Sequence, residues 1–371
     1  MRDKVIIDHQ EELDIDCQEE GNIYPMSGIK VDKGFYSIFE LKRRFDANDK
    51  RIILDSDFQR QDVWKRDRKA ELVESVLMGL PLPIFYFNQD KYGKLIVIDG
   101  RQRLTALFEY MDQKYPLTKL KVLPEENGKR FSDLSPLLQG KIEDYQIQAH
   151  VILPPTPDRL KFDIFDRVNR GGLQLNKQEI RNALYQGNAT KMLNAIVGSD
   201  EFFQATGGAF QKEKRMKDKY LVTRFLAVYL YHKSVLENDN GKPYFYKGDI
   251  DELLGKSLDY VNHLPVQEVE KLSGFILETL QKSYYYFGSD AFRLMSNDRK
   301  TPINMNVFET IMFCLSFVPN NKSAIKANLQ SEMSQLISGA DFRENIGNHR
   351  DSESKLCWRL MQAERMGRKY L

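Results

Sequence analysis

The sequence predicts an α+β protein in which a mixed α/β N-terminal domain is followed by an all-helical C-terminal domain. The length of 371 residues exceeds what one ordinary hydrophobic core fills, which favours two domains over one. Short apolar strands alternate with helices in the first half, whereas strand signals nearly vanish in the second half. We expect an acidic N-terminal arm over residues 1–35, the mixed α/β domain over 36–190 and the helical domain over 191–371.

The elements of the first half follow from charge and periodicity. Residues 1–33 hold nine Asp or Glu against four Lys or Arg and show no regular apolar period, which is typical of a loosely packed arm. In chain order, we then expect a helix over 36–47, a strand over 51–54, a helix over 67–78, strands over 84–87 and 95–98, a helix over 101–111, a strand over 119–123, a short helix near 138, a strand over 147–153 and a helix near 162–168.

Helical signals then continue to the C-terminus. Asn176 and Glu179 have the spacing of a capping box, which predicts the start of a helix and gives Glu179 a capping role. Further helices are expected over 219–233, 250–262, 266–285, 306–317, 324–337 and 354–367. The second half therefore predicts a helical domain, with a boundary near residues 186–215.

Composition narrows the class of protein. An apolar content of 42% and a charged content of 29% are those of a globular protein, and the net charge of +2 gives no strong pull toward nucleic acid. No apolar run is long enough to cross a membrane, so we expect a cytoplasmic protein without membrane contact. Cys17, Cys314 and Cys357 lie far apart and in no CxxC pair, which predicts buried or inert thiols.

The strongest functional signal lies where the strand at 95–98 runs into the helix at 101–111. Asp99 and Gly100 form the turn, and Arg101, Gln102 and Arg103 open the helix. The first amides of a helix have no partner within the helix, and the helix dipole makes that end partly positive. Glycine lets a ligand approach the backbone, and the two guanidinium groups suit phosphate oxygens. This turn is therefore a candidate anion site.

Two other loops are candidates for the same site. Gln59 and Arg60 form a polar pair in a loop that follows a strand; alternatively, Arg60 is an exposed arginine beside the core residue Trp64. Asn169 and Gly171 lie in an Asn-Arg-Gly-Gly run after a predicted helix, where two glycines free the backbone to approach a ligand. The alternative for this run is a simple helix-ending turn.

The order of these pieces resembles a known family. The pattern is similar to the domain of unknown function 262 family, the N-terminal module of GmrSD-type restriction enzymes. Its pieces are, in chain order, Gln59-Arg60, the helix ending at Gly79, the turn from Asp99 to Arg103 and the segment 165–175. The resemblance covers about residues 36–186 and implies a ParB/sulfiredoxin-like nucleotide-binding fold. The family's turn most often reads Asp-Gly-Gln-Gln-Arg, whereas Arg101 takes the third place here.

The resemblance implies a nucleoside triphosphate as ligand, with Mg²⁺ as its usual companion, and hydrolysis in some members, coupled to DNA cleavage or its control in phage defence. On the chemistry of the side chains, Arg60 and Arg103 are expected to clamp phosphates, and Gln102 to contact water or the ribose. Asp99 is a candidate Mg²⁺ ligand, or it orients an arginine; the alternatives are a helix N-cap and a structural salt bridge with Arg103. The candidate catalytic residues are Asp99, Gln102 and Arg103.

A nuclease centre is not apparent in the sequence. The five histidines are scattered, and none lies in an HExxH motif or in a setting of the HNH nuclease type. If DNA is cut, we expect a separate nuclease subunit or an unusual site to cut it. Two basic regions are candidates for contact with DNA, residues 212–219 with a net charge of +3 and a C-terminal set, and the alternative for residues 212–219 is a solvated loop. The C-terminal set is Arg343, Arg350, Lys355, Arg359, Arg365, Arg368 and Lys369.

One aromatic run also bears on DNA binding. Tyr284, Tyr285, Tyr286 and Phe287 either stack on bases or, as the simpler reading, fill the helical core. Three functions therefore remain open. The first is a nucleotide-binding, nucleotide-hydrolysing protein of a restriction or phage-defence system. The second is a non-enzymatic ParB-like adaptor for DNA or a partner, and the third is a metal-dependent DNA endonuclease.

Overall fold

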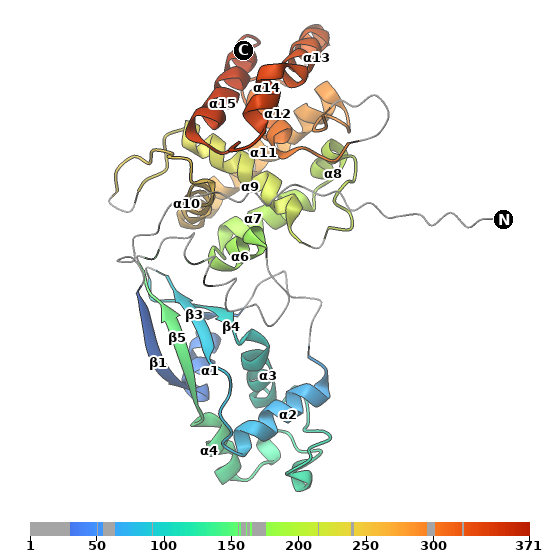
Figure 1. Ribbon diagram of the computed structural model, residues 1–371. Coiled ribbons are helices and arrows are strands. Elements are labelled where there is room, and N and C mark those ends of the chain that lie inside the picture. The colour runs from blue at the N-terminus through green and yellow to red at the C-terminus, as the bar shows by residue number, and fades with distance from the viewer. Residues whose placement is uncertain are drawn as a thin grey trace, which may run out of the picture. The chain divides into compact units, whose positions relative to one another are not determined.

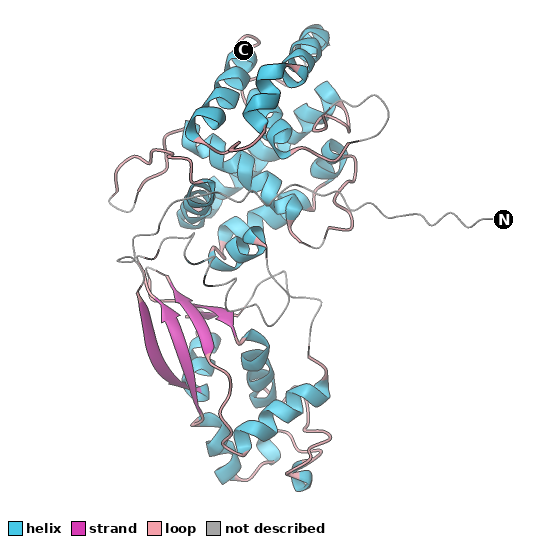
Figure 2. Cartoon of the chain, in the orientation of Figure 1, coloured by secondary structure: helices cyan, strands magenta, loops and turns pink. Residues whose placement is uncertain are grey.

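The computed structural model describes residues 30–49, 51–54, 64–90, 92–154, 156, 161, 164, 176–213, 215–238, 241–294, 301–320 and 323–371. Its elements form two compact units (Figure 1). The first, here called the sheet unit, takes the described residues up to Leu184; the second, the helical unit, runs from Tyr185 to Leu371. Figure 2 shows that the strands belong to the sheet unit, which makes the chain a mixed α/β protein with many helices.

A five-stranded sheet in the order β1-β5-β3-β4-β2 organises the sheet unit. Its strands are β1 (Val31–Ser37), β2 (Ile52–Ile53), β3 (Phe85–Gln89), β4 (Leu95–Asp99) and β5 (Gln146–Ile152). β4 runs antiparallel to β3 and parallel to β2, while β5 runs parallel to β3 and antiparallel to β1. The sheet is therefore mixed, with β4 near one edge.

Four helices cover one face of the sheet (Figure 1). They are α1 (Ile38–Asp46), α2 (Arg66–Leu77), α3 (Arg101–Met111) and α4 (Pro136–Glu143), accompanied by the short 3-10 helices η3 (Pro124–Glu126) and η4 (Phe131–Asp133). Their apolar side chains pack on every second strand residue, such as Phe85 and Phe87 of β3 and Val97 of β4. This alternation is what a strand with one core-facing side requires.

The opposite face of the sheet is also buried, at one end. Ile96 of β4 and Ile152 of β5 are each paired with Asn88 of β3, and the three side chains are at most 5% exposed. Helix α6 (Lys177–Leu184) packs against β4. Its start is the predicted capping box, because the Asn176 amide donates to Glu179 Oε2 over 2.7 Å and the Glu179 amide donates to Asn176 Oδ1 over 2.9 Å. The capping role of Glu179 is confirmed.

The helical unit is built on a large core of apolar side chains. Its helices are α7 (Asn188–Val197), α8 (Asp200–Thr206), α9 (Lys217–His232), α10 (Ile250–His263), α11 (Val266–Phe287), α12 (Met305–Leu315), α13 (Ser323–Ser338), α14 (Ala340–Ile346) and α15 (Glu353–Arg368). α12 lies at its centre, since all eleven of its residues are buried. None of the helices in the described ranges combines the length and apolar character that crossing a membrane requires.

A buried ion network joins three helices of this unit. Glu309 of α12 pairs with Arg224 of α9 over 2.8 Å and with Arg359 of α15 over 3.1 Å, and all three side chains are fully buried. Arg224 also pairs with Asp351, over 2.8 Å. The hydroxyl of Tyr246 donates to the backbone oxygen of Asp351. Glu309 is therefore shared by two arginines, and Arg224 links it to Asp351.

Several expectations about single elements were wrong. The strand over 119–123 does not form, because the amides of Val122 and Leu123 donate to the buried carboxylate of Glu74 over 2.7 and 2.9 Å instead of to a neighbouring strand. Residues from Val31 onward form β1 rather than the end of an acidic arm. The short helices α7, α8 and α14 were not expected. The helix near 162–168 falls mostly, and the arm up to residue 29 entirely, outside the described residues.

Candidate functional site at the turn between β4 and α3

The predicted turn lies between a buried strand and a helix. β4 ends at Asp99, Gly100 takes the N-cap position, and α3 begins at Arg101. The carbonyl of Gly100 accepts the first intrahelical hydrogen bond, from the Leu104 amide over 2.9 Å. No side chain caps the helix. The amides ahead of Leu104 thus have no partner within the helix, and the positive end of the helix dipole lies at this turn.

Gly100 is required by a close approach of the chain to itself. Its φ angle of 96° lies in the left-handed region, and a Cβ atom there would come within 2.1 Å of the Phe85 ring. The expected close approach is therefore made by a core side chain of β3. The glycine allows α3 to leave the sheet directly over that ring.

Arg103 is held by groups of its own domain. Its guanidinium donates to the carbonyl oxygens of Pro83 and Ile84 and to Asp99, and it lies 4.1 Å from the ring centroid of Phe85. The side chain is only 11% exposed. Burial lowers the pKa of Arg103, while Asp99 acts in the opposite direction. These contacts make Arg103 a residue that fixes the turn.

Asp99 forms the ion pair that the sequence left as an alternative. Its Oδ2 accepts from Arg103 Nη2 over 2.7 Å, and its side chain remains 40% exposed. It does not cap α3, because Gly100 holds the N-cap position. The salt-bridge alternative for Asp99 is thus confirmed. A carboxylate with one oxygen engaged and the group still open to solvent keeps the capacity to accept a second partner.

Gln102 and Arg101 complete the described part of the site. The side-chain oxygen of Gln102 is shielded from solvent and has no hydrogen-bond partner, a condition that is uncommon for a buried acceptor. Arg101 is half-buried at the first position of α3. The turn therefore presents an unused acceptor and a guanidinium group beside the open end of a helix. The guanidinium group suits an anionic ligand, whereas the acceptor suits a hydrogen-bond donor such as a water molecule.

The other predicted contacts lie outside the described residues. Gln59 and Arg60 fall in the range 55–63, and Asn169 and Gly171 fall in the range 165–175. Their convergence on the turn stays a prediction. No group of three or more His, Cys, Asp or Glu side chains suited to a metal ion occurs within the described ranges. A metal at Asp99 would consequently take its remaining ligands from elsewhere, as Mg²⁺ does when it binds through one carboxylate and substrate phosphates.

Sequence reasoning missed three buried amide side chains of the sheet unit. Asn88, Gln178 and Asn182 are each at most 3% exposed. Within the described part of the chain, Asn88 Oδ1, Gln178 Nε2 and both amide atoms of Asn182 lack a hydrogen-bond partner. The available signal was the spacing of Gln178 and Asn182, which are four residues apart in a helix. Side-chain amides that repeat on one side of a buried helix need hydrogen-bond partners.

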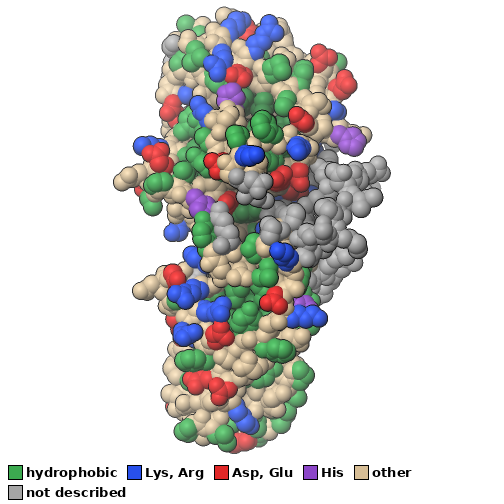
Figure 3. Space-filling model, turned by 90° about the vertical axis from the view of Figure 1, so that its left-hand side faces the viewer, with side chains coloured by type: hydrophobic (Ala, Val, Ile, Leu, Met, Phe, Trp, Pro, Cys, Tyr) green, Lys and Arg blue, Asp and Glu red, His purple; other side chains and the backbone are tan. Residues whose placement is uncertain are grey.

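Two members of the C-terminal basic set do not lie at the surface. Arg359 is fully buried in the ion network and Arg350 is 8% exposed, so neither is available to a phosphate backbone. Lys219 in the run 212–219 is likewise buried, at 7% exposure. On the face drawn in Figure 3, Lys and Arg side chains are interspersed with Asp and Glu in both units. In both predicted basic regions, fewer basic side chains are therefore available to DNA than the sequence suggests.

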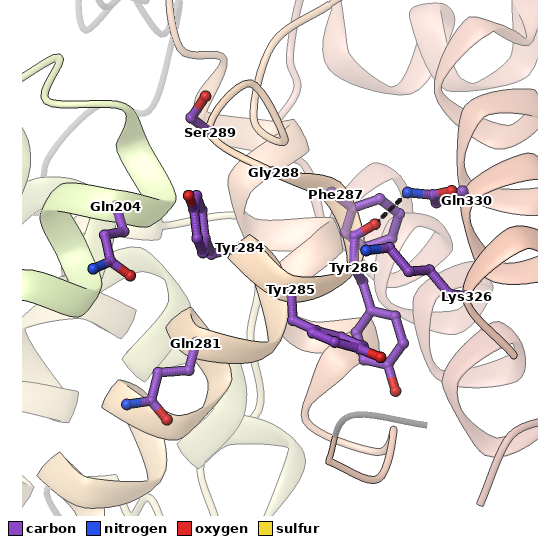
Figure 4. Close-up of a pocket in the computed structure, with 10 residues that line it drawn as sticks. All are labelled: Gln204, Gln281, Tyr284, Tyr285, Tyr286, Phe287, Gly288, Ser289, Lys326 and Gln330. Carbon is purple, nitrogen blue, oxygen red and sulfur yellow. Dashed lines mark hydrogen bonds between the residues drawn. The ribbon is translucent and has the colours of Figure 1, made fainter. Parts of the chain in front are cut away.

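The aromatic run at the end of α11 is divided between core and surface. Tyr286 is fully buried, as the core interpretation expects, whereas Tyr284 is 45% exposed. Figure 4 shows these side chains around a hollow of about 830 Å³ that also includes Lys326. The ammonium group of Lys326 lies 4.7 Å from the ring centroid of Tyr285. This hollow is open and holds one positive side chain, which is a weak basis for nucleic-acid binding.

The thiols in the described ranges are unpaired. Cys314 is buried in α12, and this burial raises the pKa of its thiol to about 12. Cys357 is half-buried on α15. A thiol with so high a pKa stays protonated at neutral pH and is a poor nucleophile. The expectation of an inert thiol is confirmed for Cys314.

Comparison with known proteins identifies one family for part of the chain. Residues 41–186 match the family model of the GmrSD restriction endonuclease, N-terminal domain. This segment contains the turn from Asp99 to Arg103 and ends two residues beyond α6. No curated protein and no solved structure matches the chain. The match supports the expected GmrSD N-terminal domain for the sheet unit, whereas the domain of unknown function 262 family and the ParB/sulfiredoxin-like fold stay resemblances of sequence.

Proposed function

We propose that the sheet unit binds a nucleoside triphosphate at the turn between β4 and α3 and hydrolyses it, as part of a restriction or phage-defence system that acts on DNA. The observation that carries this proposal is the open N-terminus of α3, which lies within the segment that matches the GmrSD N-terminal domain. Helix N-termini of this kind bind phosphate through their amides and their dipole. The match supplies the link to restriction.

The residues take separate roles in this proposal. Arg101 and the first amides of α3 contact the phosphates. Arg103 positions the turn and the carboxylate of Asp99, because its guanidinium donates to Pro83, Ile84 and Asp99. The unpartnered oxygen of Gln102 accepts a hydrogen bond from the attacking water and orients it. Mg²⁺, held through Asp99 and the phosphates, would neutralise charge on the phosphoryl oxygens.

A second candidate is an adaptor that binds nucleotide without turnover. It is favoured by the ion pair between Asp99 and Arg103, which already engages one oxygen of the carboxylate at the turn. Such an adaptor needs the same phosphate site. The two functions therefore differ only in whether phosphate is released.

The test is calorimetric titration of the protein with each of ATP, GTP, CTP and UTP, with and without Mg²⁺, followed by measurement of phosphate release. Arg101→Ala is expected to lower affinity about tenfold or more through loss of a charge-assisted contact. The matched control is Arg44→Ala, which removes an arginine of α1 that pairs with Glu40. Binding without phosphate release selects the adaptor, and absence of binding to all four nucleotides refutes both functions.

A further inference from the structure

Three carboxamide side chains of the sheet unit are buried without the hydrogen bonds they need. Asn182 is 1% exposed and neither of its amide atoms has a partner in the described part of the chain. The same holds for Nε2 of Gln178 and Oδ1 of Asn88. Burying such groups unpaired costs free energy, and native proteins rarely do so without a ligand or ordered water. Each of the three amides therefore has room for a further polar partner.

Two of the three lie on the same side of one helix. Gln178 and Asn182 are four residues apart in α6, so their side chains are neighbours along the helix surface. Arg181 Nη1 donates to Gln178 Oε1 over 2.7 Å. This bond fixes the orientation of the Gln178 amide and leaves its Nε2 as the donor to be satisfied.

The third amide lies on the strand next to the one that α6 contacts. Helix α6 packs against β4, and Asn88 of β3 is the register partner of Ile96 of β4. Ile96 and Ile152, which flank Asn88 on the two neighbouring strands, are buried on this face. Asn88 thus lies on the side of the sheet opposite the core that helices α1 to α4 cover, and α6, which carries the other two amides, packs against the neighbouring strand.

The spacing along β4 relates this face to the proposed phosphate site. Ile96 precedes Asp99 by three residues of extended chain, which corresponds to about 10 Å. In an extended nucleoside triphosphate, the base and the outer phosphates are separated by a length of the same order. A ligand whose phosphates lie at the N-terminus of α3 can therefore extend its base toward Asn88.

We propose that Asn88, Gln178 and Asn182 form the base-binding part of the nucleotide site, and that their carboxamides hydrogen-bond the polar edge of the nucleobase. The inference rests on the proposed nucleotide binding. A carboxamide presents a donor and an acceptor side by side, which matches the adjacent donor and acceptor atoms on the edge of a base. Because the amides are uncharged, this part of the site suits the neutral base rather than the phosphates.

The test uses Asn182→Leu, which keeps the shape of the side chain and removes its polar atoms. Calorimetry compares the variant with the natural protein for ATP, GTP, CTP, UTP and inorganic tripolyphosphate. We expect the affinity of the preferred nucleotide to fall about tenfold or more, while the affinity for tripolyphosphate is unchanged. The melting temperature without ligand is expected to stay equal or rise, because removal of an unpaired buried amide relieves a cost.

The control is Asn306→Leu on α12, where an equally buried asparagine of the helical unit also has an unpartnered Oδ1. It is expected to leave every affinity unchanged. The inference is overturned if Asn182→Leu binds all nucleotides as the natural protein does, or if the natural protein binds tripolyphosphate as tightly as every nucleotide. The latter result would leave the phosphate site standing, whereas absence of all binding refutes both. Gln178→Met, measured in the same way, decides the matter if Asn182→Leu fails to fold.

Discussion

The guanidinium of Arg103 forms an ion pair with Asp99 across the turn from β4 to α3, with Nη2 2.7 Å from Oδ2. The same guanidinium satisfies two backbone carbonyl groups ahead of β3, those of Pro83 and Ile84. One side chain thus ties the end of β4, the start of α3 and the entry to β3 together. Arg103 therefore fixes the geometry on which a ligand site at this turn depends.

We predict that Arg103→Ala lowers both stability and nucleotide affinity. The substitution leaves Asp99 and two sheltered carbonyl groups without their donor, which costs about 1.5–3 kcal/mol of unfolding free energy. Urea denaturation measures this loss, and calorimetry measures the affinity. Arg103→Lys, which keeps the charge but lacks the planar fork, is expected to recover only part of either quantity. An Arg103→Ala protein of unchanged stability and reduced affinity would instead identify Arg103 as a direct phosphate ligand.

We predict that Gly100→Ala destabilises the sheet unit. The new Cβ atom would lie 2.1 Å from the Phe85 ring, and the φ angle of 96° is strained for any residue with a side chain. A loss of about 2 kcal/mol or more is expected in thermal or urea denaturation. Gly140→Ala is the matched control, because Gly140 lies inside α4 with no atom within 4 Å of the added methyl group. That control is expected to gain up to about 1 kcal/mol.

The sequence was sufficient for the parts of the site that depend on local pattern. The turn from Asp99 through Gly100 to Arg103 was predictable because an apolar strand, a glycine and an amphipathic helix follow each other within a few residues. The ion pair between Asp99 and Arg103 was predictable as an alternative, since the two residues are four apart. What the sequence left open was whether Arg103 faces a ligand, because the carbonyl groups that engage it are distant in the chain.

Other parts of the fold depend on contacts that no local pattern reveals. Strand β1 was not predicted because it lies at the sheet edge and has an exposed side, where Phe35 is 67% exposed. Its extended backbone is held by hydrogen-bonded pairing with β5, which a local apolar pattern does not reveal. The apolar run after Lys119 resembles a strand. Its Val122 amide instead donates a hydrogen bond to the carboxylate of Glu74, which lies 48 residues earlier in the chain. Arg359 reads as part of a basic surface, and only its distant partner Glu309 shows that it belongs to the core.

We predict that Glu309→Ala strongly destabilises the helical unit. The substitution leaves Arg224 and Arg359 buried without the carboxylate they share, and breaking such a pair costs about 3–5 kcal/mol. Glu268→Ala on α11 is the control, because the Glu268 pair with Lys271 is exposed and is expected to contribute about 1 kcal/mol or less. Urea denaturation of the two variants measures the difference. Equal small losses would show that the buried network contributes little.

The carboxyl of Asp351 gives this network a defined pH dependence. Burial alone would raise its pKa, but the guanidinium of Arg224, with Arg359 and Arg350 nearby, outweighs burial and lowers the pKa below the ordinary value of 3.8. A carboxyl whose pKa is lower in the folded protein stabilises the fold above the unfolded pKa. That contribution is lost as the pH falls through the folded value.

We therefore predict that acid destabilises the natural protein more steeply than the variant Asp351→Asn. At neutral pH the variant should be the less stable of the two, because it lacks the charge that pairs with Arg224. As the pH falls below the ordinary pKa of 3.8, the two curves should approach each other, and they should converge once the pH is below the lower pKa of the folded protein, because the natural carboxyl is then protonated and loses the same interaction. Urea denaturation over a series of pH values measures both curves, with Asp341→Asn on α14 as an exposed control for the loss of one charge. Parallel curves over the whole range would show that Asp351 does not stabilise the fold through its charge.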